Sequence, residues 1–354
     1  MDDGNAPHDE EHDAPHAEEH DHPTPGWVST GSLPSDEEIQ TIVSTGYKRF
    51  RHVDEGAVAD YIPALAQVSP EAFGVAVAGV HGRVFAIGDA EQEFTIQSIS
   101  KLFVFALVCN ALGPAEARQK LGVNSTGLPF DSVMGIELNE DRTMNPMVNA
   151  GALATTSLVP GASPEEKFEH IVAGLSVFAG RTLVVDEEVY ASEAATNDRN
   201  RGIAHLLSGY GRMYCDPDVA TDIYTRQCSL RVSARDLAVM GATLADGGVN
   251  PLTGVRAVSS GSCRRVLPVL ATAGLYERSG DWLYDVGLPG KSGVSGGIVT
   301  VSPGKGGVGT FSPPLDEAGN SVRGQRMTTY LSERLGLNLF TSSPRPEGPA
   351  ESEG

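Results

Sequence analysis

The chain has 354 residues, enough for one large domain or two ordinary ones with a substantial hydrophobic core. It has 46 acidic residues against 26 lysines and arginines, and this net charge of −20 argues against nucleic acid or an anionic membrane surface as a partner. No apolar stretch approaches the roughly 20 residues that a membrane-spanning helix needs, so we expect no membrane association.

The N-terminus has neither the basic nor the apolar region of a secretory signal, and the four cysteines are far apart with no C-x-x-C pair. This pattern is typical of a cytoplasmic protein with reduced thiols. It favours neither a disulfide framework nor a zinc site.

Both ends of the chain are predicted to be disordered tails. Residues 1–25 are acidic and rich in histidine, and residues 343–354 are rich in Pro, Gly, Ser and Glu, so neither can bury enough apolar surface to offset chain entropy. Four histidines spaced by four would share a helix face and could bind a metal, but Pro7 and Pro15 disfavour such a helix. A solvated tail without metal is therefore the preferred interpretation. These histidines are His8, His12, His16 and His20.

Residues 26–342 are predicted to form one domain of the α+β class. Apolar runs at 73–80 and 83–88 predict a hairpin, and the run that begins at Ser98 predicts a buried helix ending before Gly113 and Pro114. Because strands are expected near both ends and helices between them, we predict one mixed, mainly antiparallel sheet and a helical subdomain. Further helices are expected at 36–49, 164–179, 200–209, 216–228, 233–246, 257–273 and 322–336, and further strands near 282–287, 297–302 and 307–312.

The sharpest chemical feature is Ser98-Ile99-Ser100-Lys101 at the front of the buried helix. Residues three apart share a helix face, so the Ser98 hydroxyl and the Lys101 amine can meet. A helix N-terminus favours an oxyanion, and apolar neighbours lower the pKa of a lysine towards that of a general base. The alternative is a capping serine beside a surface lysine, and the pattern alone does not decide between them.

A second motif, Gly290-Lys291-Ser292-Gly293, precedes a predicted strand. A K-[ST]-G strand that follows an S-x-x-K helix is typical of penicillin-recognising serine hydrolases, in which the strand edge helps to form an oxyanion hole. The alternative is a glycine-rich turn. A Ser-His-Asp triad is a further alternative, but none of the four histidines outside the tail has an evident carboxylate partner.

Two polar clusters lie between these motifs. Asn149 is followed by small residues that permit close approach of backbone or ligand, and Glu193 and Asn200 would share one face if residues 193–200 formed a single helix. Caps and a solvated helix face are the simpler interpretation of both clusters.

Taken together and in order, these segments resemble the serine-dependent, β-lactamase-like glutaminases, from about Ser35 to Leu339. The motifs that carry the resemblance are ADYIPALA (59–66), FTIQSISK (94–101), NPMVNAGA (145–152), YASEAATNDRNR (190–201), IYTRQCS (223–229), GLYERSGDW (274–282), VGLPGKSGVSGGI (286–298) and SPPLDEAGNS (312–321). The resemblance implies a serine β-lactamase or DD-peptidase-like fold and hydrolysis of L-glutamine to L-glutamate and ammonia, without cofactor or metal.

The resemblance also implies a role for each matching position. Ser98 would be the nucleophile and Lys101 its base, while Tyr61 and Tyr276 would relay protons and touch the substrate. The N–H groups of Ser98 and Val294 would form the oxyanion hole. The residues that would hold the amino-acid end of the substrate are Asn149, Glu193, Asn200 and Tyr224.

Alternatives to a glutaminase remain at this stage. A penicillin-interactive serine hydrolase would share S-x-x-K and K-S-G, but such enzymes act outside the membrane and the chain shows no secretory signal. A non-enzymatic relative would bind glutamine without releasing ammonia, which the retained Ser98, Lys101 and tyrosines disfavour. The resemblance implies a homodimer or homotetramer, and the sequence is silent on activators.

Overall fold

The computed structural model describes Met1, residues 33–60 and residues 62–341. At its centre is a five-stranded sheet in the order β2-β1-β7-β6-β5, which the first and last parts of the domain form together. β1 pairs with β7 so that Val75 lies opposite Thr310. The strands are β1 (Gly74–Gly79), β2 (Val84–Gly88), β5 (Gly290–Ser292), β6 (Gly297–Ser302) and β7 (Gly306–Phe311).

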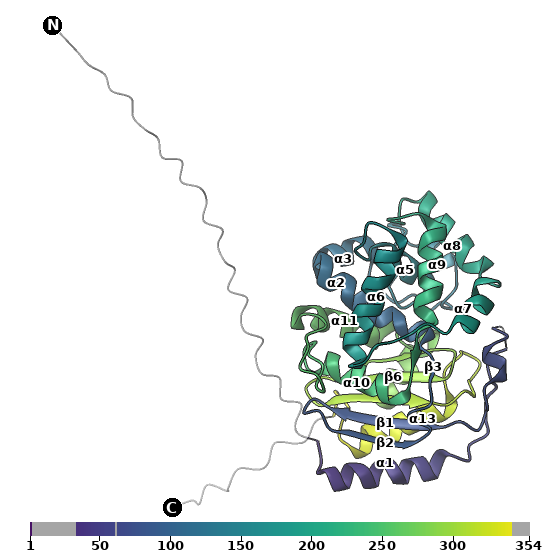
Figure 1. The fold of residues 1–354 in the computed structure, drawn as a ribbon, viewed down its shortest axis with the longest axis vertical. Coiled ribbons are helices and arrows are strands. Elements are labelled where there is room, and N and C mark those ends of the chain that lie inside the picture. Colours follow the sequence, from purple (N-terminus) through teal and green to yellow (C-terminus); the bar gives the residue numbers. More distant parts are fainter. Residues whose placement is uncertain (2–32, 61, 342–354) are drawn as a thin grey trace, which may run out of the picture.

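Helices cover the two faces of this sheet in separate layers (Figure 1). On one face, α1 (Asp36–Phe50) and α13 (Val322–Arg334) pack the apolar side chains of Val43 and Met327 against the strands. On the other face lies α10 (Ala234–Ala245), which approaches β7 closely. A Cβ at Gly307 would stand 2.3 Å from the carbonyl oxygen of Ala238, so only glycine permits this approach.

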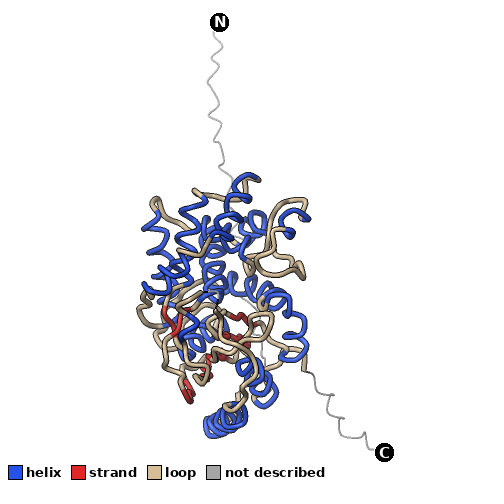
Figure 2. The backbone as a smooth tube through the Cα atoms, turned by 90° about the vertical axis from the view of Figure 1, so that its right-hand side faces the viewer, coloured by secondary structure: helices blue, strands red, loops and turns tan. Residues whose placement is uncertain are grey.

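Beyond α10 lies the helical subdomain, which is set apart from the strands in Figure 2. Its central helix is α2 (Ser100–Leu112), whose residues 100–109 are all buried because other helices surround it. Phe103 of α2 packs against Phe178 of α6, with ring centroids 5.0 Å apart. The other helices of this part are α3 (Pro114–Leu121), α4 (Met134–Leu138), α5 (Asn149–Ser157), α6 (Pro164–Ala179), α7 (Glu187–Ala194), α8 (Asp198–Gly209), α9 (Pro217–Cys228) and α11 (Ser260–Ala273).

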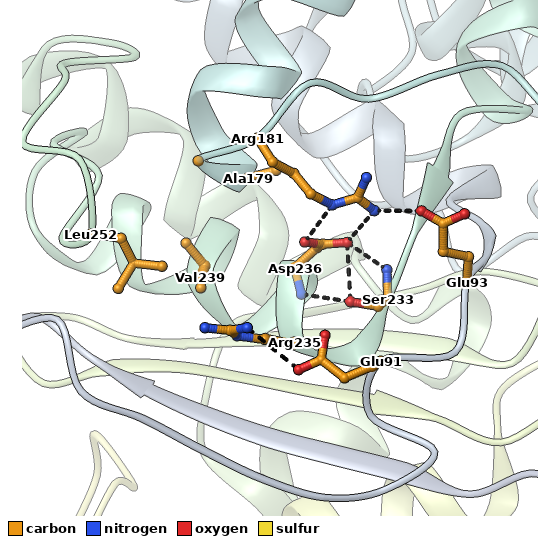
Figure 3. A pocket seen from close by; sticks show the side chains of 10 residues that line it. Glu91, Glu93, Ala179, Arg181, Ser233, Arg235, Asp236, Val239 and Leu252 are labelled. Carbon is orange, nitrogen blue, oxygen red and sulfur yellow. Dashed lines mark hydrogen bonds and ion pairs between the residues drawn. The ribbon is translucent and has the colours of Figure 1, made fainter.

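A small two-stranded sheet of β3 (Phe94–Thr95) and β4 (Arg231–Val232) links the two parts. Beside it, Arg181 at the end of α6 reaches Asp236 of α10 through two hydrogen bonds of 3.0 and 2.7 Å, and Glu93 at 2.9 Å (Figure 3). This ion network therefore ties the helical subdomain to α10 and to the segment that leads into β3.

The predicted α+β class, the hairpin and the long helices are confirmed. Every strand pair in the described part of the chain is antiparallel, where we had expected some parallel pairing. The expected strand at 282–287 is wrong, because α12 (Ser279–Val286) occupies it. Trp282 and Val286 are four residues apart and both buried, and exposed residues between them give a helical period rather than an alternating one.

None of the helices in the described ranges is long and apolar enough to cross a bilayer. The two predicted tails and their histidines lie outside the described residues, apart from Met1.

Candidate active site

Ser98 lies in a short 3₁₀ turn, Gln97–Ile99, between β3 and α2. The residue before this turn is anchored to a neighbouring segment, because the N–H of Ile96 donates to the carbonyl of Leu230 at 2.8 Å. Gln97 has a left-handed φ of 49°, a conformation that a glutamine rarely adopts and that is common at functional sites. The helix itself begins at Ser100, two residues later than the motif suggests, so Ser98 stands just before the positive end of α2.

Lys101 is 1% exposed and lies one turn beyond Ser98. Its Nζ donates a hydrogen bond to Oδ1 of Asn149 at 2.6 Å, rather than to the serine. Burial lowers the pKa of Lys101 to about 8, and the opposing influence of Cys228 and Glu193 does not offset it. A substantial neutral fraction is therefore present near physiological pH, as a general base requires.

Tyr276 begins a second 3₁₀ turn, Tyr276–Arg278, and it too has a left-handed φ, of 56°. Its hydroxyl donates to the carbonyl of Ser292 at 3.4 Å. Burial raises the pKa of the phenol to about 12, although hydrogen bonding with Ser98 and Ser292 acts in the opposite direction. Tyr276 thus presents a protonated hydroxyl beside Ser98.

Lys291 of β5 is a second buried lysine in this cluster. Its Nζ donates to the carbonyl of Ser292 at 2.9 Å and lies 4.2 Å from the centroid of the Tyr276 ring. Burial, and next the positive charge of Lys101, hold the pKa of Lys291 well below its usual value. The K-S-G strand and the S-x-x-K turn therefore meet at one place in the fold.

The loop after β5 brings Val294 to the Ser98 turn. A Cβ at Gly293 would stand 3.0 Å from the carbonyl oxygen of Ile96, so a glycine lets the loop backbone approach the turn. The hydroxyl of Ser295 donates to the carbonyl of Thr95 and holds the loop there. Val294 itself is buried, between these two residues.

Three of the predicted substrate-binding residues belong to the helical subdomain. Asn149 opens α5, and its Nδ2 donates to Oδ1 of Asn200 in α8 at 2.9 Å. Glu193 lies near the end of α7, where its carboxylate accepts a 3.3 Å hydrogen bond from Nε2 of Gln97. Burial raises the pKa of Glu193 to about 7, although Gln97 and Lys101 lower it. Residues 193–200 do not form the single helix that would have placed Glu193 and Asn200 on one face, since the chain turns between α7 and α8.

Tyr224 of α9 completes the described set. Its ring centroid lies 5.8 Å from Nζ of Lys101, and burial holds the pKa of its phenol well above the usual value. Tyr61, the remaining predicted residue, lies outside the described residues. No group of three or more His, Cys, Asp or Glu side chains in the described ranges could hold a metal ion.

Sequence reasoning did not assign Gln97 or Lys291 to the site. The K-S-G motif already marked Lys291, since a lysine at the start of a buried strand is unusual unless it is functional. No comparable signal marked Gln97 beyond its place next to Ser98. Only the folded chain places its side chain against Glu193, 96 residues away.

The arrangement provides what acyl transfer needs. A hydroxyl at a helix N-terminus, a buried lysine with a lowered pKa and a protonated phenol lie together at the junction of the two parts of the fold. A carboxylate and two amides lie on the side of the helical subdomain, where they suit the charged end of an amino acid.

Comparison with known proteins identifies the family. The family model described as Glutaminase matches residues 56–340. Among curated proteins, glutaminase 2 of Yersinia pestis is 59% identical over 321 residues, covering 91% of this chain and 94% of that protein. A glutaminase of Mycobacterium marinum is 51% identical over 306 residues, covering 86% and 96%.

Solved structures agree with these matches. A structure titled probable glutaminase ybaS has a TM-score of 0.86 and 45% identity, and covers 87% of this chain and all of that one. Mglu in its glutamate form has a TM-score of 0.82 at 41% identity, with 86% and 70% covered. A probable glutaminase from Bacillus subtilis complexed with 6-diazo-5-oxo-L-norleucine has a TM-score of 0.73 at 28% identity, with 86% and 94% covered. The described fold is thus the β-lactamase-like one, and the chain belongs to the glutaminase family.

Proposed function

We propose that this member of the glutaminase family hydrolyses the side-chain amide of L-glutamine through a glutamyl ester on Ser98. The observation that carries the mechanism is the buried Lys101, one turn from Ser98, with a pKa lowered to about 8. A lysine kept partly neutral beside a serine at a helix N-terminus can accept the hydroxyl proton as the serine attacks.

The amino-acid end of the substrate is held by groups of matching chemistry. Glu193 accepts hydrogen bonds from the α-ammonium, while Asn149, Asn200 and Tyr224 bind the rest of the amino-acid end. Support comes from their positions, since Asn149 bonds both Lys101 and Asn200. With this end fixed, the amide carbon of asparagine, one methylene shorter, would fall short of Ser98.

The reaction then runs in two steps. Ser98 Oγ attacks the amide carbon as its proton passes to Lys101 Nζ, and the N–H groups of Ser98 and Val294 hold the oxyanion. The C–N bond breaks as a proton from Lys101 reaches the nitrogen, directly or through Tyr276 and Tyr61, and ammonia leaves. Water then attacks the ester and gives a proton to Lys101. The bond between the acyl carbon and Ser98 Oγ breaks as Lys101 returns this proton to Oγ, and L-glutamate departs.

The comparisons favour this function over a penicillin-interactive hydrolase, because the family model and the relatives are glutaminases. We expect ammonia release from L-glutamine, release of the alcohol from a γ-ester of L-glutamate, and little turnover of L-asparagine. We expect Ser98→Ala to release no ammonia, and we expect its urea unfolding midpoint to equal that of the unsubstituted protein. Full turnover in Ser98→Ala, or labelling of Ser98 by a fluorescent penicillin with glutamine untouched, would contradict the proposal.

A further inference from the structure

A chain of buried polar side chains runs from the core of the helical subdomain to the nucleophile turn. Thr156 Oγ1 of α5 donates to Gln227 Oε1 at 3.1 Å, and Gln227 Nε2 of α9 donates to Ser100 Oγ at 3.3 Å. Ser100 Oγ in turn donates to the carbonyl oxygen of Gln97 at 2.8 Å. Thr156, Gln227 and Ser100 each have an exposed fraction of 0%.

The hydrogen bonds of this chain run from Thr156 through Gln227 and Ser100 to the Gln97 carbonyl. The carboxamide of Gln227 accepts from Thr156 through its oxygen and donates to Ser100 through its nitrogen, which leaves the Ser100 proton for the Gln97 carbonyl at 2.8 Å. The hydroxyl of Ser100 also contacts Sγ of Cys228 at the longer distance of 3.8 Å. Full burial makes an unmade bond costly, since no water can replace the missing partner. The Gln97 carbonyl also accepts the backbone N–H of Ser100, so the side-chain bonds and this backbone bond together hold it in one orientation.

The Gln97 carbonyl belongs to the peptide group that also contains the N–H of Ser98. A trans peptide is planar, and its C=O and N–H point in opposite directions. Fixing the carbonyl on the Ser100 side therefore aims the Ser98 N–H away from the helix core. Gln97 has a left-handed φ of 49°, which a non-glycine residue does not favour, so this conformation depends on hydrogen bonds that constrain the peptide.

We propose that Gln227 and Ser100 are positioning residues that aim the Ser98 N–H at the substrate's developing oxyanion. This inference rests on the proposed function, which assigns that N–H to the oxyanion hole. Neither residue touches the substrate in this account. Their effect reaches the reaction through the Gln97–Ser98 peptide. Thr156 fixes the carboxamide of Gln227 by donating a hydrogen bond to its oxygen.

Substitutions that remove single links test this proposal. Ser100→Ala removes the hydroxyl with the least change in packing, and Gln227→Met keeps the side-chain volume without its amide. Because oxyanion stabilisation acts in the transition state, we expect kcat to fall about tenfold to a hundredfold while KM stays within about threefold. Both residues act through one hydrogen bond. We therefore expect kcat of the double variant to lie within about twofold of kcat of the slower single variant.

A matched pair separates positioning from stability. Thr156→Val and Thr243→Val make the same change at two fully buried threonines, but the hydroxyl of Thr243 in α10 donates to the backbone carbonyls of Phe178 and Val239. We expect both variants to lose similar stability in urea, whereas only Thr156→Val lowers kcat.

The outcomes also distinguish this inference from the proposed function. Unchanged kcat in Ser100→Ala and Gln227→Met, with Ser98→Ala inactive, would overturn the inference and leave the mechanism intact. An equal loss of kcat in Thr156→Val and Thr243→Val would also overturn it, as a general effect of destabilisation. Full activity in Ser98→Ala would instead overturn the proposed function on which the inference rests. Ser100→Ala keeps the test decisive if Gln227→Met does not fold.

Discussion

At the scale of single residues, burial determines the chemistry of the site more than charge pairing does. Burial is the largest cause of the shifted pKa values of Lys101, Glu193 and Tyr276. Burial lowers the pKa of the lysine and raises the pKa of the carboxyl, so both approach neutral pH, and it keeps the phenol protonated. Groups whose pKa values are displaced in this way are candidates for acid–base roles.

These shifts predict the pH dependence of the enzyme. The proposed mechanism needs Glu193 ionised, which requires a pH above about 7, and Lys101 neutral, which requires a pH above about 8. Both groups lose a proton to become active, so kcat/KM for glutamine should rise as the pH increases from 6 to 8.5. Ammonia release across this range measures it.

Lys101→Arg is the control for this profile. A guanidinium does not lose its proton in this range, so the variant should remain inactive at every pH tested. A kcat/KM that stays constant between pH 6 and 8.5, or a Lys101→Arg variant with wild-type turnover, would contradict the assignment of Lys101 as the base.

At the scale of the elements, glycines determine how closely the segments of the site approach one another. Gly151 in the first turn of α5 shows this most clearly, because a Cβ there would stand 1.9 Å from the carbonyl oxygen of Asn145. Backbone cannot move aside as a flexible side chain can. The α5 N-terminus, and with it Asn149, therefore depends on a residue without a side chain.

We expect Gly151→Ala to destabilise the fold by about 2 kcal/mol or more, measured by urea unfolding, because it forces two backbone segments apart. Gly202→Ala is the matched control. Gly202 is also helical, in α8, but a Cβ there meets nothing within 4 Å, so this variant should gain up to about 1 kcal/mol. Equal stability of the two variants would show that the close approach at Gly151 is not required.

Most elements could be predicted from the sequence because local signals mark their ends. Ser163 and Pro164 open α6, and Gly180 ends it in a left-handed conformation, so its boundaries are set within the chain. The segment 282–287 was misassigned because its apolar residues fit a strand or a helix when it is taken alone. Packing against the rest of the core decides in favour of the helix, and a short window does not contain that information.

At the scale of the whole molecule, the site lies where the sheet part and the helical subdomain meet. The roles of Ser98 and Lys101 could be inferred from neighbouring positions in the chain. The hydrogen bond of Lys101 to Asn149, 48 residues away, and the contact of Lys291 with Tyr276 depend on how the two parts pack. Spacing along the chain does not encode these contacts.

The Arg181 network predicts how firmly the two parts are joined. We expect Arg181→Met to lower the free energy of unfolding by about 1–2 kcal/mol, because it leaves the buried Asp236 without its paired cation. Arg235→Met is the control, since its ion pair with Glu91 is largely exposed and should change stability by less than about 0.5 kcal/mol. Urea unfolding measures both, and equal losses would indicate that the Arg181 network contributes no more than a surface pair.

Several whole-molecule features stay predictions. These are the domain boundaries at residues 26 and 342, the disordered tails, the cytoplasmic location, and the homodimeric or homotetrameric state. Light scattering on the purified full-length chain measures the last of these directly.

The account depends most on a covalent bond to Ser98, and one measurement tests that bond directly. The full-length protein is incubated with 6-diazo-5-oxo-L-norleucine, an electrophilic glutamine analogue, and the adduct is located by peptide mass mapping. We predict one adduct, on Ser98, which excess L-glutamine prevents and which is absent from Ser98→Ala. An adduct on any other residue, or undiminished labelling of Ser98→Ala, would contradict the account.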